Sequence, residues 1–229
     1  MYLYDGLSLQ NGRNSNMDSL LLAEREIAGK NVLLAVVCDG VGSMRDGAFA
    51  ASLAVKCMSE WFRELSDVER VGLRMRDEAL KVNGRIIERA KENSLETAAT
   101  FTAMFFAENR YYLAHIGDTR AYSFERGGAA QLTVDDVSDG GKLTACIGRF
   151  ANPVFYCAEG DADGKIFLIC SDGLYKRMEL ASAFAGVDIK RRKDVKKIIR
   201  QLAGRAIERG ERDNISLALI IPKKREGQG

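Results

Sequence analysis

The sequence predicts an α+β fold, in which strands and helices are grouped in blocks instead of alternating regularly. Short β-prone stretches dominate both ends and the middle of the chain. Two long helical stretches come one after the other behind the first buried strand, and a further helix comes late in the chain. A doubly wound fold would alternate strand and helix throughout, so the order of the elements favours the α+β class.

The first half of the chain contains one strongly predicted strand and two long helices. Residues 31–38 (NVLLAVVC) form a continuous aliphatic run, which is typical of a strand buried on both faces. Apolar residues at helical spacing predict a helix over 48–65. A second helix is expected over 67–93, with Ser66 or Asp67 as its N-cap.

The second half consists mainly of predicted strands. Residues 100–107, 111–116 and 120–124 are short β-prone runs separated by turn residues. No internal repeat or change of composition divides the chain, so we expect one domain over 1–222 and a flexible tail over 223–229. The later predicted elements are strands over 131–134, 165–170 and 214–221, and a helix over 194–209.

The composition argues against several classes of protein. The 229 residues include 34 basic and 32 acidic side chains, and a net charge of +2 gives no broad electrostatic basis for binding nucleic acid. No apolar stretch approaches the roughly 20 residues of a membrane span, and the N-terminus lacks the pattern of a signal peptide. Five scattered cysteines without a CxxC pair fit a reducing cytoplasm. We therefore expect a cytoplasmic protein without a nucleic-acid or membrane partner, whose oligomeric state the sequence leaves open.

The single histidine, His115, narrows the possible chemistry. Zinc sites with three histidines and HExxH proteases need more than one histidine. We interpret His115 as a residue of a sheet, although a serine hydrolase that uses it as the base remains a minor alternative. The chemistry is then expected to rest on carboxylates, arginine, backbone groups or a carboxylate-bound metal.

Acidic residues stand at the ends of the apolar strands. Asp39 follows LLAVVC, Asp172 follows FLICS, and Asp213 precedes NISLALII, while Asp18 and Asp118 occupy similar turn or strand-edge positions. An Asp-Gly pair alone is ordinary turn chemistry. Five acidic turns in one chain favour another interpretation, because carboxylates that converge repel one another and favour a divalent cation.

The motifs that contain these residues resemble those of the metal-dependent Ser/Thr protein phosphatases of the type 2C class, particularly their compact bacterial members. They occur in the family's order and span nearly the whole chain. The resemblance implies a four-layer α-β-β-α sandwich with two central, mainly antiparallel sheets flanked by helices. The matching blocks are RNSNMD at 13–18, VVCDGVG at 36–42, IGDTR at 116–120, QLTVD at 131–135, LICSDGL at 168–174 and RDNIS at 212–216.

The resemblance also implies a set of metal ligands. Asp39 matches the carboxylate that bridges two Mg²⁺ or Mn²⁺ ions, and the carbonyl of Gly40 matches a ligand of one of them. Asp172 and Asp213 match ligands of the other ion. Asp118, together with Asp172, matches a pair that can hold a third and weaker ion. Oxygen donors of this kind suit hard divalent cations.

Two further matches imply the reaction. Arg13 matches the arginine that grips the substrate phosphate, and its planar fork suits a phosphoryl group. Asp18 matches a carboxylate that orients metal-bound water. The implied function is hydrolysis of phosphoserine and phosphothreonine on proteins by water activated at a pair of metal ions. The implied partners are phosphorylated proteins, such as a Ser/Thr kinase or its targets.

Several positions depart from the family's pattern. Met17 stands where the family usually has Glu or Gln, and Met44 and Ala48 replace a histidine and a glutamate. The family's G-T-T is Ala98-Ala99-Thr100 here, which we expect to affect only packing. The segment after Asp135 is short where the family carries a flap, so we expect a more open site with altered substrate choice. These departures leave an alternative open: a catalytically weak or inactive pseudophosphatase that acts as a binding or regulatory module.

A basic run, RRKDVKKIIR over 191–200, lies outside these motifs. It has six basic residues and one acid, so it could bind an acidic partner or nucleic acid. We interpret it as the solvated face of a helix.

Overall fold

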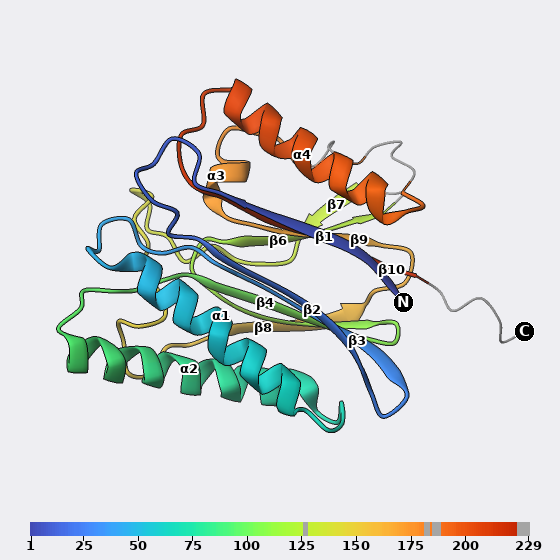
Figure 1. The fold of residues 1–229 in the computed structure, drawn as a ribbon, viewed down its shortest axis with the longest axis horizontal. Helices are drawn as coiled ribbons and strands as arrows, with labels where there is room; N and C mark the ends of the chain where they lie inside the picture. Colours follow the sequence, from blue (N-terminus) through green and yellow to red (C-terminus); the bar gives the residue numbers. More distant parts are fainter. Residues whose placement is uncertain (126–127, 181–183, 185–188, 224–229) are drawn as a thin grey trace, which may run out of the picture.

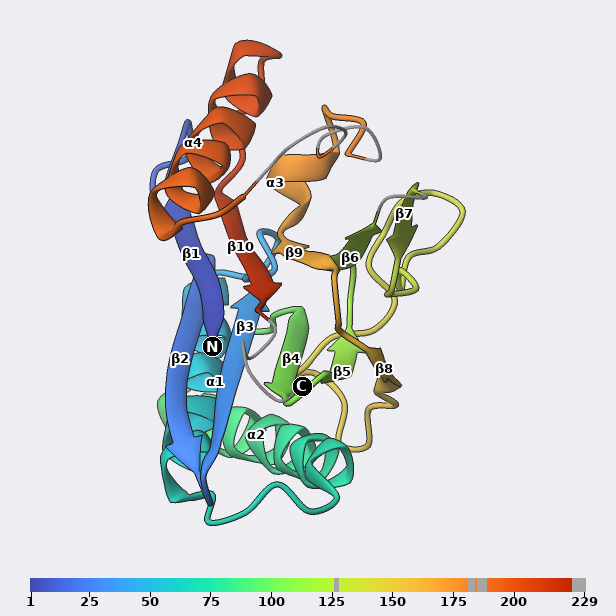
Figure 2. The same ribbon diagram turned by 90° about the vertical axis from the view of Figure 1, so that its right-hand side faces the viewer.

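Two five-stranded antiparallel sheets lie face to face at the centre of the molecule, with helices on both outer sides (Figure 1; Figure 2). This computed structural model describes residues 1–125, 128–180, 184 and 189–223. It confirms the predicted α+β class and the four-layer sandwich. The first sheet contains, in spatial order, β1 (Tyr2–Leu9), β10 (Ile215–Pro222), β9 (Ile166–Cys170), β6 (Arg120–Glu125) and β7 (Gly128–Gln131).

The second sheet is covered by the two long helices α1 (Gly47–Glu64) and α2 (Val71–Asn93). On the opposite side of the sandwich, α4 (Arg192–Glu208) packs on the first sheet, and the short α3 (Asp172–Tyr175) follows β9 (Figure 1). The second sheet contains, in spatial order, β2 (Ser19–Ile27), β3 (Lys30–Cys38), β4 (Phe101–Ala107), β5 (Arg110–Ile116) and β8 (Tyr156–Asp161).

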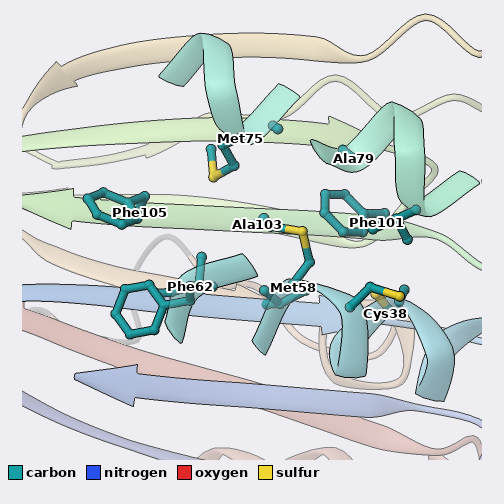
Figure 3. Packing of buried hydrophobic residues seen from close by; sticks show 14 of the residues in the cluster. Cys38, Met58, Phe62, Met75, Ala79, Phe101, Ala103 and Phe105 are labelled. Carbon is teal, nitrogen blue, oxygen red and sulfur yellow. The ribbon is translucent and has the colours of Figure 1, made fainter. Parts of the chain in front are cut away.

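The apolar core consists of three layers. Between the helices and the second sheet, Met58 and Phe62 of α1 and Met75 of α2 pack against Phe101 and Phe105 of β4 (Figure 3). A second layer fills the space between the two sheets, and a third lies under α4. Each large apolar side chain that is buried in this way contributes about 1.5–3 kcal/mol to folding. The core therefore fixes both sheets, and with them the loops at their ends.

Three strands are not predicted from the sequence: β1, β2 and β8. All three are edge strands. β1 contains Asp5 and Gly6, and β2 is rich in Leu, Ala, Glu and Arg, which have no strong preference for strands. They form because each pairs along its length with a buried neighbour, as β2 does with β3. The pairings of β1 with β10 and of β8 with β5 are distant in sequence and leave little trace in local composition, whereas β2 and β3 form a hairpin.

Two predicted boundaries are wrong. α2 begins at Val71 and not at 67, because the Asp67 carboxylate accepts a hydrogen bond from the N–H of Glu69 in a separate turn. The N-cap position of α2 is Arg70, in the left-handed region at φ 48°, so neither Ser66 nor Asp67 caps it. β7 covers Gly128–Gln131 and not 131–134.

The two ends of the described chain lie side by side. The N–H of Lys223, the first residue of the predicted tail, donates to the carbonyl of Met1, and 224–229 lie outside the described residues. All five cysteines are free, and only Cys157 is exposed. Among the helices that the structure describes, none has the length and apolar character that crossing a membrane requires.

Candidate active site

One pocket at an end of the sandwich collects most of the predicted site residues. Its volume is about 350 Å³. Asp18 does not line it but lies directly behind, almost fully buried. The pocket is lined by six of the seven predicted residues, namely Arg13, Asp39, Gly40, Asp118, Asp172 and Asp213.

The antiparallel topology explains why residues so distant in sequence meet there. Neighbouring strands run in opposite directions, so the end of one lies beside the start of the next. Asp39 follows the end of β3, and Asp172 follows the end of β9. Asp213 precedes the start of β10, and Asp118 lies in the turn between β5 and β6. These four positions therefore lie at the same end of the two sheets.

Thr100 holds Asp39 at both of its backbone groups. The N–H of Asp39 donates to Oγ1 of Thr100 over 2.9 Å, and the N–H of Thr100 donates to the carbonyl of Asp39, also over 2.9 Å. Oγ1 of Thr100 also forms a hydrogen bond with Oγ1 of Thr119, next to Asp118. The Asp39 backbone is thereby fixed to β4. Thr100, to which the sequence analysis assigned no role of its own, therefore positions a predicted metal ligand.

The two glycines that follow Asp39 and Asp172 are required by close backbone approaches. A Cβ on Gly40 would lie 2.6 Å from the backbone carbon of Gly47, and a Cβ on Gly173 would lie 2.0 Å from the carbonyl oxygen of Asn214. Neither contact leaves room for a side chain. These Asp-Gly pairs therefore serve the packing of chain segments around the pocket, which goes beyond ordinary turn chemistry.

Arg13 and Asp213 form a bidentate ion pair across the mouth of the pocket. Nε and Nη2 of Arg13 donate to the two carboxylate oxygens of Asp213 over 2.8 and 2.6 Å. Asn214 holds the Arg13 loop in place, because its side chain accepts from the N–H of Met17 and donates to the carbonyls of Gln10 and Ser15. The loop between β1 and β2 is thus attached to the start of β10.

Asp18 belongs to a buried polar network behind the pocket. Oγ of Ser171 donates to Oδ2 of Asp18 over 2.8 Å, and the N–H of Ser216 donates to the same Oγ over 2.9 Å. The other carboxylate oxygen of Asp18, Oδ1, is buried and has no partner among the described residues. The carboxylate is therefore bonded through one oxygen, and its other oxygen is buried without a partner among the described residues.

The electrostatics of the site show an excess of negative charge. Burial raises the pKa of Asp39 well above its usual range, and Asp18, Asp172, Asp118 and Asp213 raise it further. Burial and the charge of Asp172 raise the pKa of Asp118 to about 6. Burial also raises the pKa of Asp18 to about 6, although hydrogen bonds from Ser216 and Ser171 oppose the shift. Such shifts mean that the ionised carboxylates are short of positive partners.

Two side chains of the protein compensate part of this charge. Burial of Asp213 acts to raise its pKa, but the hydrogen bonds from Arg13 and from the N–H of Asn214, together with the charges of Arg13 and Lys176, lower it overall. Lys176 forms an ion pair with Oδ2 of Asp172 one turn away. Burial acts to lower the pKa of Lys176, but the bond to Asp172 and the charges of Asp172, Asp118 and Asp213 together raise it above its usual value. The other oxygen of Asp172, Oδ1, is buried without a partner among the described residues.

The donor set fits a hard divalent cation, although the side chains are not arranged around one. Carboxylates, a backbone carbonyl and space for water are the ligands that Mg²⁺ and Mn²⁺ prefer. The orphaned oxygens of Asp18 and Asp172 and the raised pKa of Asp39 point to missing positive charge. Within the described part of the chain, however, no three His, Cys, Asp or Glu side chains stand as a group that could hold an ion. To bind an ion, Asp213 would have to give up a contact with Arg13, whereas Asp172 has one oxygen, Oδ1, that Lys176 does not occupy.

His115 is a structural residue, as interpreted from the sequence. It is fully buried, its Nδ1 is bonded to Oγ1 of Thr102, and its Nε2 is bonded to the carbonyl of Val134. Burial lowers its pKa. Both ring nitrogens are occupied, so His115 has no free nitrogen to activate a serine.

Four residues that shape the site are missed by the sequence analysis: Thr100, Ser171, Asn214 and Lys176. Ser171 and Asn214 stand next to predicted ligands within the SDG and DNIS motifs, so their position was a usable signal. Thr100 acts on Asp39, which belongs to a separate part of the chain, and Lys176 acts on Asp172, one helical turn before it. Their roles depend on where the backbone places them.

The short segment after Asp135 reaches the pocket. Gly141 and Leu143 line it. Asp136 fixes the start of the segment, because its carboxylate accepts from the N–H of Gly117 and its own N–H donates to the Gly117 carbonyl, both over 2.8 Å. The segment therefore forms one wall of the pocket despite its small size.

The protein is an α-β-β-α sandwich, and its acidic pocket lies at one end of the two sheets, among the loops that connect the strands. The sequence model of the family described as Protein phosphatase 2C matches residues 10–213. The chain therefore belongs to the Protein phosphatase 2C family.

Individual relatives and solved structures agree with this assignment. The serine/threonine protein phosphatase PstP of Mycobacterium tuberculosis is 30% identical over 187 residues, which cover 71% of this chain but only 34% of PstP. The chain thus spans about a third of that relative. Stp1, a serine/threonine phosphatase from Staphylococcus aureus, shares the fold with a TM-score of 0.87 at 17% identity, over 98% of this chain and 96% of Stp1. The PstP catalytic domain in complex with two manganese ions has a TM-score of 0.74 at 24% identity, over 96% and 97% of the two chains.

Proposed function

We propose that this chain is a metal-dependent phosphatase that hydrolyses phosphoserine and phosphothreonine in proteins. The observation that carries the proposal is the pocket, in which four carboxylates and Arg13 meet in a member of the Protein phosphatase 2C family. The names of PstP and Stp1 support the same activity. The substrates would be products of a protein Ser/Thr kinase, or the phosphorylated kinase itself.

The cofactor in this proposal is Mg²⁺ or Mn²⁺. Asp39, the carbonyl of Gly40, Asp172 and Asp213 would hold two ions, and Asp118 with Asp172 would hold a third and weaker one. The excess negative charge of the pocket and the two manganese ions of the PstP complex support this set. When bound, such ions supply a Lewis acid at the phosphoryl group and lower the pKa of water.

The chain's own side chains would bind and orient the reactants. Arg13 offers a guanidinium that already lies at the pocket and is more than half exposed. A phosphoryl group can take over the two hydrogen bonds that Arg13 now gives to Asp213, because its oxygens match the same fork. Asp18, buried directly behind the pocket, has an unpartnered Oδ1 and would orient the attacking water by accepting a hydrogen bond there.

A second candidate function is a pseudophosphatase that binds partners without turnover. The specific observation in its favour is that Asp172 and Asp213 are already paired, with Lys176 and Arg13. Met17 adds no carboxylate to the pocket that it lines. A site of this kind would bind divalent ions weakly, and activity is therefore what separates the two candidates.

The deciding experiment measures turnover of p-nitrophenyl phosphate and of a phosphothreonine peptide with Mn²⁺, with and without EDTA. We expect activity that depends on the metal and falls at least about a hundredfold in Asp39→Asn, because the variant loses the central carboxylate. Asp77→Asn removes an exposed carboxylate on α2 and serves as the matched control. Absence of turnover across metals and pH would leave the pseudophosphatase, and activity unaffected by EDTA would contradict both.

A further inference from the structure

The outer face of α4 carries basic side chains that the fold does not use. Lys193, Lys196, Lys197, Arg200 and Arg205 are all exposed and line one shallow hollow along the helix. Lys193, Lys196, Lys197 and Arg200 include pairs three and four residues apart on successive helical turns, and Arg205 follows five residues after Arg200. The opposite face of α4 is apolar and is buried against the outer surface of the first sheet. The basic face therefore points to solvent over about 18 Å of helix.

These five cations have little compensation within the part of the chain that the structure describes, where the charge of Lys193 acts on Asp194 in the first turn of α4. None of them forms an ion pair or side-chain hydrogen bond with a described residue, and the hollow contains one acid, Glu208. α2 shows the opposite pattern, since Arg74, Arg76, Lys81 and Arg89 each pair with a nearby carboxylate.

Such an arrangement destabilises an isolated helix. Like charges three or four residues apart repel each other, and cations in the first turns oppose the helix dipole. In a chain with a net charge of only +2, this concentration of charge is a local feature and does not follow from the composition as a whole. A bound anionic partner would remove the repulsion.

We propose that this face of α4 is a docking surface for an acidic segment of a partner protein. Five cations over about 18 Å match an extended peptide of roughly five or six residues, at about 3.3 Å each. Their charge is complementary to aspartate and glutamate side chains, and arginine can bind a carboxylate through two hydrogen bonds.

Other polyanions fit this surface less well. A nucleic acid is charged along its whole length, and the exposed face of α4 has no aromatic side chain for stacking on bases. A membrane-bound helix inserts an apolar face, whereas the apolar face of α4 is buried in the core. A peptide segment needs complementary charge only over its own short length.

The position of α4 suggests that the partner is the substrate, a step that rests on the proposed function. The helix ends at Glu208, and the chain continues through 209–213 to Asp213 at the pocket. Arg209 donates to the carbonyl of Arg177, which fixes this end of α4 beside α3. A segment that lies along α4 would thus lead towards the mouth of the pocket, and the phosphorylated residue would be flanked by acidic residues.

The docking surface can be tested without any enzymatic activity. The probe is a fluorescein-labelled peptide with six consecutive glutamates between Gly-Ser ends, titrated in low salt and followed by anisotropy. We expect the triple variant K196E/K197E/R200E to bind at least about tenfold more weakly, because it reverses three of the five contacts. The control K56E/R63E/K91E makes the same change of net charge on exposed residues of α1 and α2. It should change affinity less than about twofold.

Three results would overturn the docking surface. The first is that the wild-type chain does not bind the peptide in low salt. The second is that both triple variants lose the same affinity for the peptide. The third is that a single-stranded oligonucleotide or phosphatidylserine vesicles bind more tightly than the peptide. Circular dichroism of both variants confirms that the helices are intact. The overall charge, rather than α4, would explain an equal loss.

The substrate step has a kinetic test. With Mn²⁺, K196E/K197E/R200E should raise KM at least about tenfold for a phosphothreonine peptide with an acidic flank, and leave p-nitrophenyl phosphate turnover unchanged. An unchanged KM overturns the substrate step. No turnover in any variant would contradict the proposed function, and the anisotropy result would still decide the docking surface.

Discussion

At the scale of single residues, the site is defined by side chains that hold the backbone of the carboxylates. Thr100 is the clearest case, because it binds both backbone groups of Asp39 and is itself buried. A carboxylate whose backbone is fixed in this way loses little freedom when it binds an ion. Positioning therefore resides in a residue that carries no charge.

Thr100→Val tests this role. The change keeps the shape but removes the hydroxyl, so the N–H of Asp39 loses its partner. We expect a loss of about 1–3 kcal/mol in the free energy of unfolding by urea, and weaker Mn²⁺ binding in a fluorescence or calorimetric titration. Thr100→Ser keeps the hydroxyl and is the control. Unchanged metal affinity in Thr100→Val would show that the contact serves stability alone.

Lys176 affects the same site through charge. Its ion pair with Asp172 occupies one oxygen of a predicted ligand and adds positive charge to the pocket. Lys176→Met should therefore tighten Mn²⁺ binding by about threefold or more, because the cation no longer competes for Asp172. Lys91→Met, on an exposed turn of α2, is the control. Weaker Mn²⁺ binding in Lys176→Met would mean that Lys176 orients Asp172 for the ion.

At the scale of secondary-structure elements, glycines set how closely the segments around the pocket approach each other. α3 begins with Asp172 and Gly173, and a Cβ on Gly173 would collide with the carbonyl oxygen of Asn214 at 2.0 Å. α3 and the start of β10 therefore share one backbone contact. The relative position of Asp172 and Asp213 depends on it.

Gly173→Ala should separate these elements. We expect destabilisation by about 1–3 kcal/mol or more, since the atom in the way belongs to the backbone and cannot turn aside, together with reduced Mn²⁺ binding. Gly204→Ala is the matched control in α4, where nothing lies within 4 Å of the added Cβ. It should stabilise the protein by about 0.5–1 kcal/mol in urea denaturation. A Gly173→Ala protein as stable as wild type would contradict the close approach.

At the scale of the whole molecule, the acidic site works against folding when no metal is bound. Asp18, Asp39 and Asp118 each have a raised pKa in the folded chain. For such a carboxylate, the folded state binds more protons than the unfolded state between the two pKa values. Ionisation therefore destabilises the fold above the folded pKa, and this effect disappears as the pH falls towards the unfolded value of about 3.9.

This linkage predicts an unusual effect of Asp39→Asn in the presence of EDTA. At about pH 7.5 the variant should melt about 3 °C or more above wild type, and the difference should shrink towards about pH 5.5, where wild-type carboxylates take up protons. Comparing the two proteins cancels the opposite contribution of His115, which is common to both. With Mn²⁺ the order should reverse, because only wild type binds the ion tightly. If Asp39→Asn is less stable than wild type in EDTA at both pH values, the acidic site does not carry a destabilising excess of negative charge.

Local sequence patterns determined much of the fold and the membership of the site. Continuous apolar runs such as NVLLAVVC predict buried strands, because burial on both faces excludes polar residues. The order of the acidic motifs led to six residues that line one pocket. Four of these acids, Asp39, Asp118, Asp172 and Asp213, stand close to the place where a strand begins or ends.

Only the tertiary structure decided the edge strands and the partners of each charge. β1, β2 and β8 have weak local preferences and form because a buried neighbour offers unpaired backbone groups. The pairing of Arg13 with Asp213 joins residues 200 positions apart, and the clamp of Thr100 on Asp39 spans 61 positions. Contacts of this kind depend on how two sheets pack, and no local stretch of sequence contains that information.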